Sequence, residues 1–319
     1  MPAHEPPQIV CVTLNPAVDR TFEVNDLEIG QHAKGRLVFT HPAGKAVNVA
    51  RVLQHLGRSC LLTGFVGEAQ RKLFEDSFDP ALVHTQFFGV RTPTRENITL
   101  VDASRGTETH VRDIGQGVGE DDISKLTRKL EILARPDVWM VFAGSLPQGL
   151  TVEYFWSMLQ AVVGRGARVV LDSSEAALAV VRKVPVWLIK PNLRELAELA
   201  GMPTGTPGQI VAAARSLGKA TQAALVSAGE DGCYLIDRRR ALHAHLTRLP
   251  RKAVNTVGCG DSLLAGFLAA RAEGRRAEDC LRHAVAAGTG ACFQLRAGEV
   301  DPAEVARIVP QVEVEPLNL

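Results

Sequence analysis

The segment NTVGCGDS (residues 255–262) leads directly into the apolar run LLAGFLAA (residues 263–270). The run has the composition of a buried helix, and the two glycines before the acidic residue indicate a tight turn. Such a turn lets backbone N–H groups converge at the start of the helix, where the helix dipole also favours negative charge. The segment therefore predicts an anion site at a helix N-terminus, with a carboxylate beside it.

Asp261 is not explained by anion binding alone, because its carboxylate repels a phosphate. It is explained if the carboxylate takes a proton from a hydroxyl while the backbone N–H groups of Gly258, Cys259 and Gly260 stabilise developing negative charge. That combination suits phosphoryl transfer to a hydroxyl. The alternative is an ordinary glycine turn in which Asp261 caps the helix, and the segment alone fits both hypotheses.

Short apolar strands alternate with helix-like stretches along most of the chain. The predicted strands are residues 9–14, 60–67, 138–142, 167–171, 186–189 and 223–226. The predicted helices are residues 48–56, 152–163, 193–200 and 209–217. This alternation predicts an α/β fold with a mostly parallel sheet covered by helices on both faces. Residues 20–40 and 86–112 are polar and poor in helix signals, so we expect extended segments there that stand off the main sheet.

The composition is that of an ordinary globular protein, with 46% hydrophobic and 22% charged residues among 319, enough for one large domain. The net charge of +1 gives no electrostatic case for nucleic acid or for an anionic membrane, and no apolar run reaches transmembrane length. The six cysteines are scattered without a Cys-x-x-Cys pair, so neither a zinc site nor a disulfide framework is indicated. We expect a cytoplasmic protein with no nucleic-acid or membrane partner.

Five segments, in order, resemble the signatures of the PfkB carbohydrate kinase family, also called the ribokinase family. They are TLNPAVDR (13–20), PAGKAVNVAR (42–51), GSLPQG (144–149), KPNLREL (190–196) and NTVGCGD (255–261). The resemblance runs from Val10 to about Gly298 and matches the phosphosugar branch. It implies a single kinase domain over residues 1–319 with a ribokinase-like three-layer fold. It also implies a small β-sheet lid at about 20–40 and 86–112, which in this family often forms a homodimer contact.

The chain departs from the family pattern at three positions. Cys259 stands where alanine is usual, which places a thiol beside the predicted reaction centre. Ala43 and Ala46 replace glycines of the second signature, so each methyl group either narrows the sugar site or excludes a positive φ. We expect these two alanines to affect which sugar fits more than which reaction occurs.

The resemblance implies a set of sugar-phosphate ligands in the first three signatures and in the lid. They are Asp19, Lys34, Gly44, Lys45, Asn48, Arg95, Arg112 and Ser145. Asp19 and Asn48 suit sugar hydroxyls, because a carboxylate accepts hydrogen bonds and an amide both donates and accepts them. Arg95 suits a phosphate, because a guanidinium binds its oxygens bidentately. Each charge taken singly is also typical of a solvated surface, but their concentration in these segments favours a phosphorylated ketohexose as the substrate.

The resemblance also implies an ATP site in the last two signatures and in a glycine loop after a predicted strand. Its residues are Lys190, Asn192, Glu195, Ser227, Ala228, Gly229, Glu230, Asp231, Gly232 and Gly260. Asn192 and Glu195, three residues apart on a helix, are expected to order the waters around Mg²⁺, which keeps much of its hydration in proteins. The alternative is that Asn192 only caps its own helix.

Together these features predict an ATP- and Mg²⁺-dependent phosphosugar kinase, with conversion of fructose 1-phosphate to fructose 1,6-bisphosphate as the expected reaction. Tagatose 6-phosphate and fructose 6-phosphate stay as alternative substrates, because the motifs do not choose among them. A non-catalytic sugar- or nucleotide-binding protein on the same fold is the alternative of another class, and the retention of Asp261 with both glycines argues against it. The sequence contains neither a P-loop signature nor a nucleophile elbow.

Overall fold

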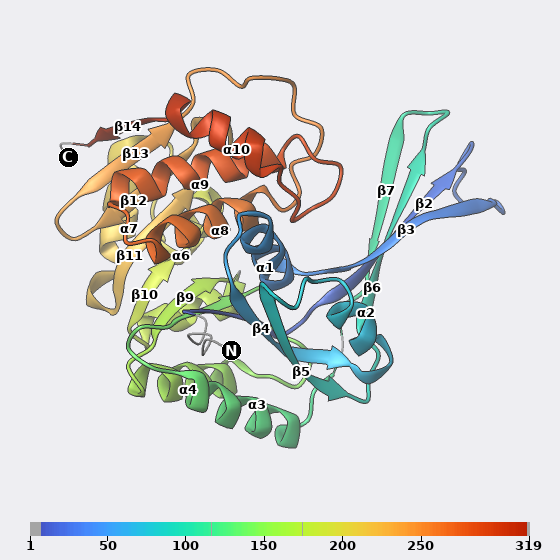
Figure 1. The fold of residues 1–319 in the computed structure, drawn as a ribbon, viewed down its shortest axis with the longest axis horizontal. Coiled ribbons are helices and arrows are strands. Elements are labelled where there is room, and N and C mark those ends of the chain that lie inside the picture. Colours follow the sequence, from blue (N-terminus) through green and yellow to red (C-terminus); the bar gives the residue numbers. More distant parts are fainter. Residues whose placement is uncertain (1–7, 116, 174, 318–319) are drawn as a thin grey trace.

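A ten-stranded sheet runs through the centre of the molecule (Figure 1). The structure is a computed structural model that describes residues 8–115, 117–173 and 175–317. From edge to edge the sheet contains β14 (Glu313–Pro316), β13 (Ala241–His245), β12 (Cys233–Asp237), β11 (Thr221–Ser227), β10 (Val186–Ile189), β9 (Arg168–Asp172), β8 (Trp139–Ala143), β1 (Ile9–Thr13), β4 (Cys60–Gly67) and β5 (Val83–Val90). The strands from β11 to β5 are parallel, and β12, β13 and β14 form an antiparallel edge.

The central strands are apolar on both sides because each face of the sheet is covered. In β1, Ile9 and Cys11 lie in one hydrophobic core, whereas Val10 and Val12 lie in the other. The side chains of a strand alternate between the two faces, so a strand between two cores needs an unbroken apolar run. The segment IVCVT (residues 9–13) has such a run, and all five residues are buried.

Helices cover both faces of the large sheet. They are α1 (Lys45–His55), α2 (Arg71–Glu75), α3 (Glu120–Leu133), α4 (Val152–Gly164), α5 (Glu175–Ala179), α6 (Leu193–Ala200), α7 (Pro207–Ser216), α8 (Cys259–Ala272), α9 (Ala277–Ala291) and α10 (Pro302–Ile308). One core contains residues of α1, α8, α9 and α10, and the other contains residues of α3, α4, α6 and α7. This confirms the predicted three-layer α/β fold. None of the helices that the structure describes is long and apolar enough to cross a membrane.

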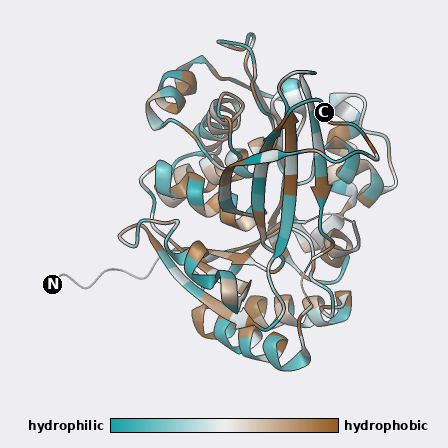
Figure 2. Cartoon of the chain, turned by 90° about the vertical axis from the view of Figure 1, so that its right-hand side faces the viewer, coloured by the Kyte–Doolittle hydropathy of each residue, from teal (hydrophilic) through white to brown (hydrophobic). Residues whose placement is uncertain are grey.

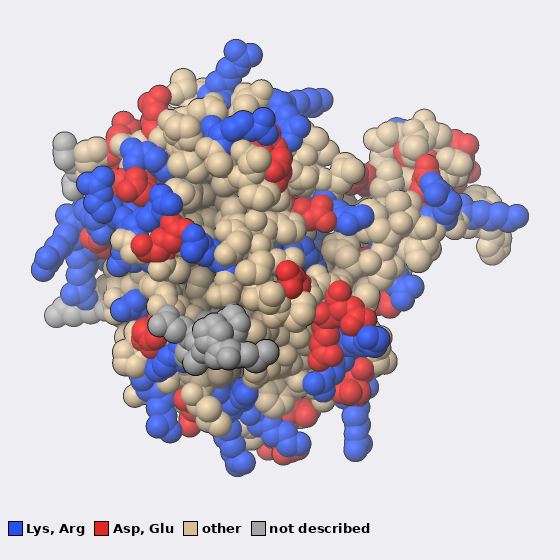
Figure 3. Space-filling view, in the orientation of Figure 1, with Lys and Arg blue, Asp and Glu red and all other residues tan. Residues whose placement is uncertain are grey.

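A second, four-stranded sheet projects from the body of the molecule (Figures 1 and 3). Its order is β3 (Gly35–Ala43), β2 (Ala17–Val24), β6 (Arg95–Asp102) and β7 (Thr107–Arg112). Because β2 follows β1 after a short turn, the small sheet is attached at the carboxyl end of β1. Every residue of β7 is exposed, and Figure 2 shows hydrophilic and hydrophobic residues mixed along the strands of this sheet.

Several details differ from the sequence-based predictions. Helix α1 begins at Lys45 rather than Asn48, because Gly44 with a φ of 122° ends the preceding strand and caps the helix. The antiparallel strands β12, β13 and β14 lie outside the predicted elements. Residues 86–90 of the second predicted extended segment belong to β5 of the large sheet.

Candidate active site

A glycine turn precedes α8. Gly258 has a φ of 81°, in the left-handed region, and is the N-cap of the helix. Asp261 is the third helical residue and is 6% exposed. The helix has no side-chain cap, and Asp261 Oδ2 instead accepts a hydrogen bond of 2.8 Å from Asn48 Nδ2. The alternative in which Asp261 caps the helix is therefore wrong.

The backbone N–H groups of this turn differ in their partners. The N–H of Cys259 makes a long contact of 3.5 Å within the turn, and the N–H of Ser262 donates to Gly258 O at 2.9 Å. In the described part of the chain, the N–H groups of Gly258, Gly260 and Asp261 have no hydrogen-bond partner. These groups are available to an anion at the helix N-terminus, and they include Gly258 and Gly260 of the predicted set.

Two lysines and an aspartate carry the charge beside this turn. Asp172 is the last residue of β9, is fully buried, and lies 2.8 Å from Lys45 Nζ and 3.1 Å from Lys190 Nζ. Lys45 opens α1 and Lys190 follows β10, so three elements meet at the carboxyl ends of the parallel strands, where ligands bind in open α/β sheets. A methyl group on Gly260 would lie 3.2 Å from Lys190 Nζ, which places this ammonium next to the turn.

These buried charges shift the pKa values of the site. Burial, and then the charge of Asp172, raise the pKa of Asp261 to about 6, against the lowering effects of Asn48 and the two lysines. Burial opposes the charge on Lys45, but the carboxylate of Asp172 raises its pKa overall. Asp261 is thus ionised at pH 7 while being a stronger base than an ordinary carboxylate, which suits general-base catalysis.

The attached end of the small sheet holds a row of polar residues. Asp19 in β2 lies between His41 of β3 and Asn97 of β6 in the strand register. Asn97 Nδ2 donates to Asp19 Oδ1 at 2.8 Å, and His41 Nε2 lies 4.0 Å from Asp19 Oδ2. Burial is the largest cause of the lowered pKa of His41. One oxygen of Asp19 is thus fixed by an amide, and the other faces a weakly basic ring.

Arg95, at the start of β6, reaches back to the turn after β1. Its Nε donates to Pro16 O at 3.1 Å, its Nη2 to Asn15 O at 3.2 Å and its Nη1 to Asp113 O at 3.4 Å. Arg112 ends β7 and lies close enough that its charge adds to burial in lowering the pKa of Arg95. The structure therefore brings both predicted arginines to the attached end of the small sheet.

Lys34 is not brought to this end. It directly precedes β3, where Gly35 pairs with Val24, whereas Asp19 pairs with His41 near the other end of the same strand. A strand rises about 3.3 Å per residue, so Lys34 lies roughly 23 Å from His41 along β3. Within one chain, the structure separates Lys34 from the other predicted sugar-phosphate ligands.

Ser145 follows β8 and is bonded to a residue that the sequence-based predictions omit. Asn15 Nδ2 donates to Ser145 Oγ at 3.1 Å, and in the described part of the chain the buried Asn15 Oδ1 has no partner. Asp172 is the second omission. Asn15 follows the end of β1 by two residues, and Asp172 is the last residue of β9. Ligands bind at the carboxyl ends of parallel strands, so a polar residue at the end of a predicted strand was the signal that could have identified both.

Gly44 connects the small sheet to α1. A Cβ there would lie 3.2 Å from Pro16 Cα, and its φ of 122° strains any other residue. Ala43 and Ala46, which replace family glycines, have no positive φ, and both are buried. The replacements therefore introduce no backbone strain, and any effect on the sugar comes from the space that the methyl groups occupy.

Asn192 and Glu195 form a reciprocal cap at the start of α6. The N–H of Glu195 donates to Asn192 Oδ1 at 2.8 Å, and the N–H of Asn192 donates to Glu195 Oε2 at 2.9 Å. The capping role given as the alternative for Asn192 is thus present. Glu195 Oε1 and Asn192 Nδ2 take no part in the hydrogen bonds of this cap.

The glycine loop at residues 227–232 lies beside this cap. Ser227 forms an isolated β-bridge with Asn192. Gly229 and Gly232 have φ values of 61° and 81°, and a Cβ on Gly232 would lie 2.0 Å from Ala244 O. The loop, which includes Ala228, Glu230 and Asp231, is therefore packed closely against β13.

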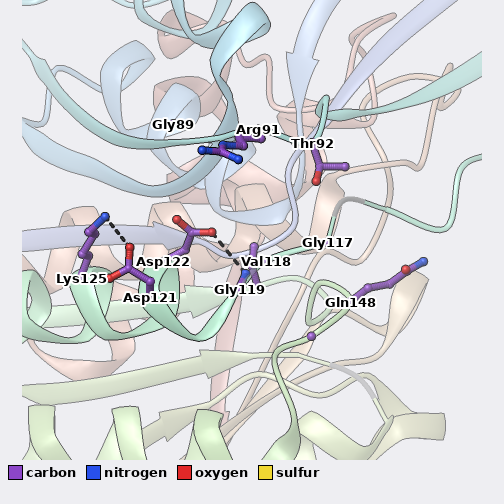
Figure 4. A pocket seen from close by; sticks show the side chains of 11 residues that line it. Gly89, Arg91, Thr92, Gly117, Val118, Gly119, Asp121, Asp122, Lys125 and Gln148 are labelled. Carbon is purple, nitrogen blue, oxygen red and sulfur yellow. Dashed lines mark hydrogen bonds and ion pairs between the residues drawn. The ribbon is translucent and has the colours of Figure 1, made fainter.

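The hollow in Figure 4 is a separate region of the surface. It has a volume of about 710 Å³ and is lined by residues of α3 and of the segments after β5 and β8. Asp121 and Lys125, which form an ion pair of 2.6 Å, contribute to its wall. None of the predicted site residues lines it.

A buried carboxylate with a raised pKa can take the proton from a hydroxyl as that hydroxyl attacks a phosphoryl group. The N–H donors at the helix N-terminus can stabilise the negative charge of the phosphoryl group during the transfer. On a three-layer α/β fold with a small second sheet, this arrangement defines a ribokinase-like small-molecule kinase.

Comparison with known proteins gives the family. The model for pfkB family carbohydrate kinases matches residues 12–303. The chain is 33% identical to 1-phosphofructokinase of Vibrio cholerae over 97% of both chains, and 32% identical to that of Haemophilus influenzae over 96% of this chain and 97% of the other. Escherichia coli phosphofructokinase-2, in complex with substrates and products, superposes with a TM-score of 0.85 at 25% identity, covering 95% of this chain and 98% of that one. The chain belongs to the PfkB family of carbohydrate kinases.

Proposed function

We propose that this chain transfers the γ-phosphate of ATP to a hydroxyl of a phosphorylated ketohexose, and that the reaction is fructose 1-phosphate to fructose 1,6-bisphosphate. The observation that carries the proposal is the buried Asp261 carboxylate, held by Asn48 at 2.8 Å beside backbone N–H groups that have no partner in the described chain. The choice of fructose 1-phosphate is supported by the relatives named 1-phosphofructokinase.

Asp261 acts as the general base. The hydrogen bond from Asn48 fixes one carboxylate oxygen and leaves the other for the attacking hydroxyl. As the hydroxyl loses its proton, the N–H groups of Gly260 and Asp261 stabilise the charge on the transferring phosphoryl group. Lys190, next to Gly260, adds a positive charge at the same place, and Asp172 holds its ammonium in position.

The attached end of the small sheet binds the sugar phosphate. Asp19, oriented by Asn97, accepts hydrogen bonds from sugar hydroxyls. Arg95 and Arg112 bind the phosphate that the substrate already carries. An arginine has five N–H donors, so the three backbone carbonyls that Arg95 contacts leave it donors for phosphate oxygens.

The nucleotide binds over α6 and the loop at residues 227–232. When bound, Mg²⁺ neutralises charge on the nucleotide phosphates. Glu195 fits this ion because its Oε1 stays outside the helix cap and Mg²⁺ prefers oxygen ligands and retained waters. Asn192 and Glu195 would hold the water shell of the ion, and the cap that joins them keeps both side chains in one orientation.

The small sheet also offers a surface for a homodimer. Leu37 and Val38 in β3 and Val111 in β7 are large apolar residues with exposed fractions of 45%, 47% and 54%. These residues lie on the two edge strands of the small sheet, and exposed apolar residues of this kind support an association surface there. Sedimentation analysis should give a dimer for the wild type and a larger monomer fraction for Val111→Lys, and a wild-type monomer at all concentrations would contradict this part of the proposal.

Release of ADP, measured by a coupled assay, tests the proposed reaction. The panel is fructose 1-phosphate, tagatose 6-phosphate, fructose 6-phosphate, free fructose and free ribose. We expect the highest kcat/KM with fructose 1-phosphate. Efficient turnover of a free sugar would contradict the phosphate-binding role of the arginines, and no turnover of any sugar would favour the non-catalytic alternative.

A further inference from the structure

Two cysteines meet at the N-terminus of α8. The Sγ atoms of Cys259 and Cys292 lie 3.0 Å apart. These two are partly exposed, whereas the other four cysteines of the chain are buried. Reactive thiols are partly accessible and structural thiols are enclosed, so this pair is the one that a small reagent reaches. Among the described residues, the group with metal-ligand spacing lies elsewhere, at His243, His245 and Glu315.

The two thiols are not equivalent. A hydrogen bond from Cys259 lowers the pKa of Cys292 to about 7, against the effect of burial. The same contact and burial raise the pKa of Cys259. A thiol whose pKa lies near the ambient pH is an effective nucleophile, so Cys292 is suited to attack and Cys259 to resolve the product.

We propose that Cys259 and Cys292 form a reversible disulfide that inactivates the kinase when the chain meets a peroxide. The Cys292 thiolate attacks one oxygen of hydrogen peroxide, forming a sulfenic acid and releasing hydroxide, which takes a proton to become water. The Cys259 sulfur then attacks the Cys292 sulfur, the S–S bond forms, and the hydroxyl leaves as water with the Cys259 proton. Two thiols lose two electrons and two protons, and one peroxide becomes two waters.

This inference rests on the proposed function, because the disulfide acts on the turn that stabilises the phosphoryl group. Gly258 is closely packed, since a methyl group on it would lie 2.9 Å from Ala297 Cβ. Gly298 is equally confined, since its methyl group would lie 3.0 Å from Asn48 Cα. The turn has little room to move without changing the contacts of Asn48, which orients the base.

Cys292 also holds the segment that leads into the turn. Its carbonyl accepts hydrogen bonds from the N–H groups of Val254 at 2.7 Å and Asn255 at 3.1 Å. A disulfide between the two sulfurs would tie this segment covalently to Cys259, the first residue of α8. Displacing a reacting group by about 1 Å can lower a rate by about 10²-fold. We therefore expect the bond to misplace the N–H groups that face the phosphoryl group.

Oxidation of the full-length protein tests the inference. The fully reduced enzyme is treated with hydrogen peroxide, and the mass, the peptide that joins residues 259 and 292, and kcat are measured together. We expect loss of two hydrogen atoms, the cross-linked peptide, a fall in kcat of about 10²-fold, and recovery with dithiothreitol. An active enzyme that forms no cross-link, or a cross-linked enzyme with unchanged kcat, would overturn the inference.

Two variants serve as controls. Cys292→Ser should keep the activity of the reduced enzyme and resist peroxide, because no disulfide can form. Cys280→Ser removes a buried thiol of the neighbouring helix and should respond to peroxide like the wild type. Equal inactivation of Cys292→Ser would place the damage elsewhere and overturn the inference. Formation of the disulfide is measured by mass and does not depend on kinase activity. A reduced enzyme without kinase activity would therefore contradict the proposed function and not the formation of the disulfide.

Discussion

The polar residues of the two sheets are held very differently. At the carboxyl edge of the large sheet, Asp172 is fully buried between two lysines and Asp261 is 6% exposed with its own amide partner. In the small sheet, β7 has no buried residue, and Arg112 at its end is exposed. The chemical step is thus assigned to groups fixed by a packed core, and sugar recognition to a sheet whose strands can vary without disturbing that core.

The difference has an energetic side. Burial removes water from the charged groups, and this desolvation disfavours their ionised forms. An ionised Asp261 therefore lowers the stability of the folded protein. On the small sheet, the exposed Arg112 remains hydrated, and its removal should affect binding far more than folding. Substitutions in the two regions should therefore change different quantities.

Asp261→Asn should have the largest effect. The amide keeps the shape and can still accept the hydrogen bond from Asn48, but it cannot take a proton. General-base help typically contributes ~10²–10⁴-fold, so kcat should fall by that factor while the KM for ATP changes little. Steady-state kinetics at saturating sugar phosphate measure both, and a variant with near-normal kcat would remove Asp261 from the mechanism.

The same variant should be more stable than the wild type. A carboxyl whose pKa rises from 3.8 to about 6 on folding disfavours the folded state by roughly 3 kcal/mol when ionised. The cost is fully present above pH 6 and disappears as the pH falls towards 3.8, because Asp261 becomes protonated in the folded state. Urea unfolding at pH 7 and pH 4.5 should show a gain that shrinks at the lower pH. A loss of stability at pH 7 would mean that the carboxylate is structurally needed.

Arg95→Ala should raise the KM for the sugar phosphate and leave kcat and the KM for ATP nearly unchanged. Hydrogen bonds to charged groups contribute about 1.5–3 kcal/mol, which corresponds to a rise in KM of roughly 10–100-fold. Arg36→Ala is the matched control, because Arg36 is an exposed arginine at the outer end of the same sheet. Equal effects of the two substitutions would show that Arg95 acts only through general charge.

The pH dependence should report the raised pKa of Asp261. Since only the ionised carboxylate accepts a proton, kcat/KM should fall about tenfold per pH unit below pH 6. The substrate phosphates also ionise near this pH, so Asp261→Asn is the control. Its pH profile should show the ionisation of the substrates but not the titration of residue 261. Superimposable profiles for the two enzymes would rule out Asp261 as the titrating group.

The sequence was most informative where the functional residues are neighbours in the chain. Gly258, Cys259, Gly260 and Asp261 could be placed at a helix N-terminus because the glycines and the apolar run that follows are contiguous. The alternating strands and helices likewise predicted the large sheet, since a buried parallel strand needs a short apolar run.

Contacts between distant segments were not predictable in this way. The ion pair of Lys45 with Asp172 joins residues 127 positions apart, and no local pattern specifies it. Lys34 was assigned to the sugar site although it lies at the outer end of the small sheet. Its distance from Asp19 depends on the register of β2 and β3, which is set by tertiary packing rather than by the sequence near Lys34.

The division of roles between the two sheets is tested most directly by one ratio, kcat/KM for fructose 1-phosphate divided by kcat/KM for free fructose. It should be measured for the wild type, Asp261→Asn and Arg95→Ala. We expect Asp261→Asn to lower both constants by the same factor and leave the ratio unchanged, and Arg95→Ala to lower the ratio by roughly 10–100-fold. A ratio that changes in Asp261→Asn, or stays constant in Arg95→Ala, would contradict the assignment of chemistry to the large sheet and phosphate recognition to the small one.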